Sequence, residues 1–84
     1  MMEAVLRRVM GSVVGAATGG SNTTLTDTNK DFETDRFKNA DIHIYKNGKE
    51  YIRTVISNTS DTFTFNALPT GVSVEAGDAY SVVG

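Results

Sequence analysis

Residues 42–56 read IHIYKNGKEYIRTVI, and this stretch decides the fold of the chain. Two apolar runs flank Asn47-Gly48, the strongest short-range signal for a β-hairpin. A two-residue loop would place Ile52 on the face opposite Ile44, because directly paired residues share a face of the sheet. A three-residue loop over 46–48, with Gly48 in the left-handed region, brings the isoleucines together. The sequence therefore predicts a bulged hairpin whose core face carries Ile42, Ile44, Ile52 and Ile56.

In this register the other face of the hairpin pairs Asp41 with Arg53 and His43 with Tyr51. Such a patch could bind a ligand or exchange protons. A flat face exposed to solvent offers little concavity and little perturbation of pKa values, which functional sites normally need. We therefore interpret the four residues as cross-strand pairs, each contributing roughly 0.2–1 kcal/mol.

Alternating apolar and polar residues continue along the chain from residue 12. Leu25 is expected to point inward, Phe63 and Phe65 to join the core, and Phe32 and Phe37 to pin the polar loop 27–40 onto it. Short strands between polar turns are typical of all-β domains. The pattern predicts an antiparallel barrel or sandwich of six to seven strands over residues 12–84, with strands at 12–18, 23–26, 41–46, 49–57, 62–66, 72–74 and 79–83.

The first eleven residues have a different period and form the second predicted segment, an N-terminal amphipathic arm over 1–11. A helix of about ten residues is marginal alone in water, so its apolar stripe needs a surface to cover. That surface is either the chain's own β-domain or a neighbouring subunit; a third alternative is that the segment is partly strand. The apolar stripe has helical spacing and provides the candidate oligomer or docking contacts Met2, Val5, Leu6, Val9 and Met10.

Composition limits the classes of function. The chain has 84 residues, typical of one domain, a net charge of -2, one His and no Cys. Clustered basic residues are lacking, so no nucleic-acid partner is expected. Arg7 and Arg8 interrupt the apolar start, and no stretch reaches the ~20 apolar residues of a membrane span. We expect a protein made in the cytoplasm, with no membrane partner.

No motif points to catalysis or to a cofactor. DTNKD at 27–31 matches half of a calcium loop, but Phe32 stands where that loop needs Gly and Lys38 where it needs Glu. Asp27 and Asn29 are instead expected to make turn hydrogen bonds to the backbone. Asn22 and Asn58 begin glycosylation sequons, which we interpret as coincidence in a Thr-rich chain. We expect no enzyme activity, no metal and no cofactor.

Threonines and the tyrosines Tyr45, Tyr51 and Tyr80 could form a surface for glycans or for a wet protein interface. The simpler interpretation is the ordinary preference of Thr and Tyr for strand faces. A carbohydrate- or surface-binding module is therefore the alternative functional hypothesis.

The order of the segments TTLTD, KDFETDRFKNADIHI, EYIRTVISNTSDTFTF and GDAYSV, over residues 21–83, resembles small β-domains in structural proteins of tailed bacteriophages and prophages. The resemblance implies a particle component, such as a head accessory, a head–tail junction protein or a tail component. It implies self-association, other virion proteins as partners, and residence in the host cytoplasm during assembly and then in the virion. It implies no catalytic residues.

Overall fold

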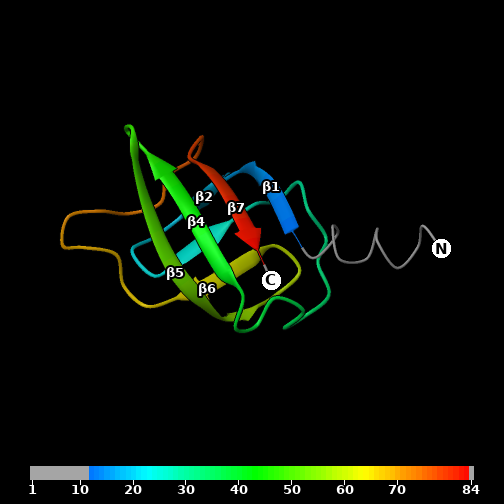
Figure 1. Cartoon of the computed structure of the whole chain (residues 1–84). Coiled ribbons are helices and arrows are strands. Elements are labelled where there is room, and N and C mark those ends of the chain that lie inside the picture. The colour runs from blue at the N-terminus through cyan, green and yellow to red at the C-terminus, as the bar shows by residue number, and fades with distance from the viewer. Residues whose placement is uncertain (1–11, 84) are drawn as a thin grey trace.

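The computed structural model describes residues 12–83, and this part of the chain is an all-β unit of seven antiparallel strands without a helix (Figure 1). This confirms the predicted all-β class, and the strand count agrees with the predicted six to seven, although β2 is an unpredicted strand and takes the place of the one predicted at 72–74. The predicted arm, including Met2, Val5, Leu6, Val9 and Met10, lies outside the described residues. The strands are β1 (Ser12–Ala16), β2 (Gly19–Gly20), β3 (Thr24–Thr26), β4 (Asp41–Lys46), β5 (Lys49–Asn58), β6 (Thr62–Phe65) and β7 (Ala79–Val83).

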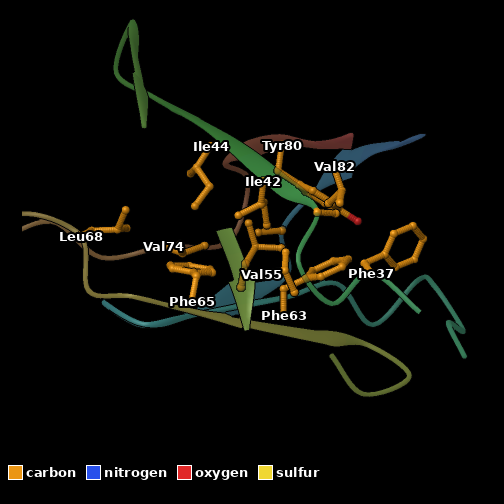
Figure 2. Packing of buried hydrophobic residues seen from close by; sticks show 13 residues of the cluster. Phe37, Ile42, Ile44, Val55, Phe63, Phe65, Leu68, Val74, Tyr80 and Val82 are labelled. Atoms are coloured by element: carbon orange, nitrogen blue, oxygen red, sulfur yellow. The ribbon is translucent and has the colours of Figure 1, made fainter. Parts of the chain in front are cut away.

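The strands form one sheet in the order β1-β7-β4-β5-β6-β3-β2. Strand β5 belongs to both halves of this sheet: residues up to Thr54 pair with β4, and residues from Val55 pair with β6. The pairing shifts between Val55 and Ser57, a β-bulge of the kind that bends a strand and increases its twist. The bend in β5 therefore lets the two halves of the sheet face each other across the core, as Figures 1 and 2 show.

The two ends of the sheet are close in sequence, since only Ala17 and Thr18 separate β1 from β2. At this corner the amide of Ala17 donates to the carbonyl of Asp78 (2.8 Å), and the amide of Thr18 donates to the carbonyl of Thr26 (2.7 Å). Among the described residues no strand ladder joins β1 to β2. The sheet is therefore curled but not closed into a barrel.

The predicted register of the hairpin is wrong. Ile44 pairs with Tyr51, and Lys46 pairs with Lys49, which leaves a two-residue turn. Asn47 and Gly48 have φ values of 51° and 81°, as a type I′ turn requires. The prediction failed because it placed all four isoleucines inside.

Val55, not Ile52 or Ile56, completes the buried row of β5. Ile42, Ile44 and Val55 are fully buried, whereas Ile52 and Ile56 are about half exposed. The inward positions nearer the turn are filled by partly buried side chains rather than by aliphatic ones. Two of the four predicted core isoleucines therefore lie on the outer face of the sheet.

The core lies between the two halves of the sheet and is rich in aromatic rings (Figure 2). Phe63 is the central ring, with Phe32, Phe37 and Tyr80 at centroid distances of 5.0, 5.9 and 5.9 Å. Phe32 and Phe37 meet edge to face at 5.3 Å, a favourable arrangement for aromatic pairs. This confirms that the two rings pin the loop 27–40. Leu25, Phe63 and Phe65 are also buried, as predicted.

The segment between β6 and β7 is irregular. The predicted edge strand over residues 72–74 does not form a ladder, although Val74 is buried and its amide donates to the carbonyl of Ser21 (3.0 Å). This connection is held against the core by burial of the Leu68 and Val74 side chains rather than by strand pairing.

Candidate docking face

The outer side of β1, β7, β4 and β5 is unusually apolar for a sheet face that contacts solvent. Such a face normally carries polar side chains that alternate with the buried ones. Within residues 12–83, every large hydrophobic side chain classed as exposed belongs to these four strands. We call this set the docking face, and its members are Val14, Tyr45, Ile52, Ile56 and Val83.

The strand registers place these side chains in rows across the sheet. Val14 pairs with Ser81, Ser81 with His43, and His43 with Ile52, so one row crosses all four strands. The next row holds Ala16, Ala79, Tyr45 and Glu50. The middle strand β7 contributes only small side chains to these rows. Strand β7 therefore separates Val14 of β1 from the larger side chains of His43 and Tyr45 on β4.

One polar pair interrupts the docking face. The imidazole Nδ1 of His43 lies 2.7 Å from Oε2 of Glu50, a hydrogen bond in which the ring donates. Both side chains are partly exposed, so the pair contributes little to stability. Asp41 is exposed on the same side of β4. The charged groups of the face are thus mainly acidic.

The structure does not bring the predicted polar patch together. Asp41 and His43 lie on the outer side of β4, whereas Tyr51 and Arg53 lie on the inner side of β5, because Tyr51 pairs with the buried Ile44. The predicted pairs Asp41–Arg53 and His43–Tyr51 are therefore wrong. Their partners across the strands are Thr54 for Asp41 and Ile52 for His43.

Arg53 and Tyr51 instead make contacts that stabilise the fold. The guanidinium of Arg53 donates to the carbonyls of Ile52 (2.8 Å) and Ala67 (3.3 Å). Tyr51 packs against the core cluster. Arg53 therefore ties β5 to the segment that follows β6.

Asp27 and Tyr80 form the polar interaction of the interior. The hydroxyl of Tyr80 donates to Oδ2 of Asp27 at 2.7 Å, and both residues are buried. The other carboxylate oxygen accepts the amide of Asn29 (3.1 Å), which confirms the predicted turn hydrogen bond of Asp27. Burial, followed by the hydrogen bond to Asp27, raises the pKa of Tyr80. With both oxygens engaged inside the protein, Asp27 is not presented as a calcium ligand.

Lys46 at the end of β4 binds the turn that precedes β7. Its ammonium donates to Glu75 (2.8 Å) and Asp78 (3.1 Å), and Asp78 also accepts the amide of Glu75 (2.9 Å). The hydrogen bonds to Glu75 and then Asp78 raise the pKa of Lys46. The cluster joins segments 29 to 32 residues apart, so its clearest role is structural.

Asn22 and Asn58, the two sequon residues, hold loops in place through hydrogen bonds from their side-chain amides to backbone carbonyls. The side-chain amide of Asn22 donates to the carbonyls of Leu68 and Val72 (3.0 and 2.9 Å). That of Asn58 donates to the carbonyls of Glu33 and Thr59 (3.0 and 2.9 Å). The repeated SNT triplet at 21–23 and 57–59 was the sequence signal that could have revealed them.

Residues 12–83 provide neither a cluster of metal ligands nor a membrane-spanning helix. This part of the chain contains no cluster of three or more His, Cys, Asp or Glu residues arranged to hold a metal ion. It also contains no helix of the length and hydropathy needed to cross a membrane.

No protein-family model matches the chain, and neither a curated protein nor a solved structure matches it at a significant level. Function must therefore be inferred from the residues and geometry of the chain itself.

Proposed function

We propose that this protein is a structural component of a phage or prophage particle that acts through self-association and docking. The observation that carries the proposal is the docking face, where Val14, Ile52, Ile56 and Val83 are between 48% and 70% exposed. Exposed apolar side chains gathered on one side of a sheet favour an interaction surface over an ordinary solvent-facing one. A small core also gains stability when subunits associate. Positions as a head accessory, a head–tail junction protein or a tail component all agree with this mode of action.

The interior polar groups support a structural rather than a catalytic role. In the described part of the chain, every buried side-chain nitrogen or oxygen has a hydrogen-bond partner. The buried side-chain hydrogen bonds of Tyr80 to Asp27 (2.7 Å) and of the Phe37 amide to Asn58 (2.8 Å) join strands and loops. Polar side chains that make such hydrogen bonds stabilise the fold and are not available to act on a substrate.

The alternative, a carbohydrate- or surface-binding module, has less support. The three tyrosines are not gathered on one surface, since Tyr45 is exposed, Tyr51 is partly buried and Tyr80 is buried. Three of the four threonine hydroxyls on β3 and β6 are engaged with neighbours: Thr24 bonds to Ser21 (2.8 Å), Thr26 bonds to Thr62 (3.0 Å), and Thr62 donates to Asp61 (2.9 Å). Few aromatic or hydroxyl groups are thus left to form a glycan site.

Sedimentation of the full chain over a range of concentrations tests self-association. Ile52→Glu places a charge on the docking face and is expected to shift the chain to monomer. Asn66→Glu adds the same charge on an exposed position outside the face and is expected to leave the oligomer intact. Circular dichroism verifies that both variants fold.

A full chain that stays monomeric at all concentrations would overturn self-association. The particle role has its own test, which is mass spectrometry of purified particles from a host that carries the gene. Particles that consistently lack the chain would overturn that part of the proposal.

A further inference from the structure

We infer that residues 2–10 of a second copy of the chain lie across the docking face. This inference rests on the proposed function, because it names the partner in the proposed self-association. The face needs an apolar cover, and the sequence supplies one in the apolar stripe directly before β1. The members of that stripe are Met2, Val5, Leu6, Val9 and Met10.

The dimensions of the stripe and the face agree. Four adjacent strands span three strand spacings of about 4.8 Å, or about 14 Å from β1 to β5. Met2 and Met10 are eight residues apart, which at the helical rise of 1.5 Å per residue corresponds to about 12 Å. A stripe that runs from Met2 to Met10 therefore matches the width of the face from Val14 to Ile52.

The charges of the two surfaces are complementary. The docking face presents Asp41 and Glu50, whereas the segment before β1 carries Arg7 and Arg8 and a single acidic residue, Glu3. Long arginine side chains can reach past an apolar contact to carboxylates at its edge. Opposite charges of this kind favour a defined orientation of the segment on the face.

The length of the connection favours a second copy over the chain's own face. Only Gly11 separates Met10 from Ser12, where β1 begins. Layers of secondary structure pack with their axes about 10 Å apart. Two Cα–Cα steps reach at most about 7 Å. The short connection therefore limits how the stripe can turn back onto its own sheet, whereas a neighbour's face carries no such constraint.

Disulfide trapping tests this arrangement cleanly, because the natural chain has no Cys. One protein carries Leu6→Cys and another Ile52→Cys; the two are mixed, allowed to exchange subunits and oxidised. The expected product is a disulfide-linked pair joining the two variants, identified by the mass of the linked peptides. Asn66→Cys replaces Ile52→Cys in the control, because Asn66 is exposed and follows β6, outside the docking face.

The outcomes separate this inference from the proposed function. A yield several-fold above the Asn66→Cys control, with loss of the oligomer on removal of residues 1–10, supports the inference. An oligomer that persists without residues 1–10 and gives no crosslink between copies overturns it and leaves self-association standing. A variant that carries both Leu6→Cys and Ile52→Cys is oxidised in parallel, and a crosslink formed only within that chain overturns the inference and assigns the face to the chain's own segment. A chain that is always monomeric overturns the proposed function as well.

Discussion

The hydroxyl of Tyr80 and the carboxylate of Asp27 meet at 2.7 Å in the interior, although the residues are 53 positions apart in the chain. Tyr80 lies on β7, and Asp27 directly follows β3, so the hydrogen bond joins the two halves of the curled sheet. Gly15 on β1, the strand partner of Tyr80, lies over this pair. The arrangement leads to three predictions about stability.

Tyr80→Phe is expected to lower the free energy of unfolding by about 1–3 kcal/mol, because it leaves a buried carboxylate oxygen without its donor. Urea denaturation of the wild type, Tyr80→Phe, Asp27→Asn and the double variant measures the coupling between the two side chains. The double variant is expected to lose less stability than the sum of the single variants. Strictly additive losses would show that the hydrogen bond does not join the two halves energetically.

Stability is expected to fall in alkaline solution through Tyr80. Its pKa is raised by burial and then by the hydrogen bond to Asp27. The unfolded chain therefore releases this proton first as pH rises above about 10, the ordinary value for tyrosine. The contribution of Tyr80 to the free energy of unfolding is therefore complete below pH ~10. It declines above that pH, by at most about 1.4 kcal/mol per pH unit for one proton.

Denaturation between pH 8 and pH 11 provides the measurement, with Tyr80→Phe expected to show a shallower decline than the wild type. Lys46 has a raised pKa as well, and its contribution is lost in the same direction. A Lys46→Met background removes that contribution from the comparison. Equal slopes with and without the Tyr80 hydroxyl in that background would contradict the assignment to Tyr80.

Gly15→Ala is expected to destabilise the protein because the backbone of β1 approaches the interior pair closely. An added Cβ would lie 2.9 Å from Oδ2 of Asp27 and 3.2 Å from the hydroxyl of Tyr80. Overpacking of this kind typically costs about 1–3 kcal/mol. Gly19→Ala is the matched control, since nothing lies within 4 Å of its added Cβ. Equal thermal stability of the two variants would contradict the close approach.

Strand positions could be predicted from the sequence because alternation and turn residues are local signals. The predicted ranges 41–46 and 79–83 agree with β4 and β7, and Leu25, Phe63 and Phe65 are buried as expected. The hairpin register could not be predicted in this way. It depended on whether Ile52 faced the core, and the exposure of an isoleucine is decided by tertiary packing.

The sequence also did not reveal the docking face or the interior polar pair. The face became visible only when the register placed Val14, Ile52 and Val83 on one side of the sheet. The contact between Asp27 and Tyr80 depends on the curl of the sheet, which brings together residues distant in sequence. Both features arise from long-range topology, which carries no local periodic signal.

The turn offers a direct test of the observed register. Gly48 has a φ of 81°, in the left-handed region that a residue with a Cβ adopts at a cost of about 1–2 kcal/mol. Gly48→Ala is expected to lower stability by about that amount, and Gly48→Asn by less, because Asn tolerates this conformation better. Thermal denaturation of both variants makes the comparison. An alanine variant as stable as the wild type would contradict a type I′ turn at these residues.

Asn58→Ala is expected to loosen the loop 33–39 while the sheet remains folded. The side-chain carbonyl of Asn58 accepts the amide of Phe37 (2.8 Å), and its NH₂ group donates to the carbonyl of Glu33 (3.0 Å). Removing this buried side chain deprives these backbone groups of their partner, at a cost of about 1–3 kcal/mol.

Hydrogen exchange followed by NMR distinguishes local loosening from global loss of stability. In Asn58→Ala the amide of Phe37 is expected to lose more protection than the amide of Phe65, which donates to the carbonyl of Thr23 (2.9 Å). Asn66→Ala, at an exposed position, is expected to alter neither amide. A uniform fall in protection at Phe37 and Phe65 would show instead that Asn58 supports the whole domain rather than this loop, because both amides would then exchange through global unfolding.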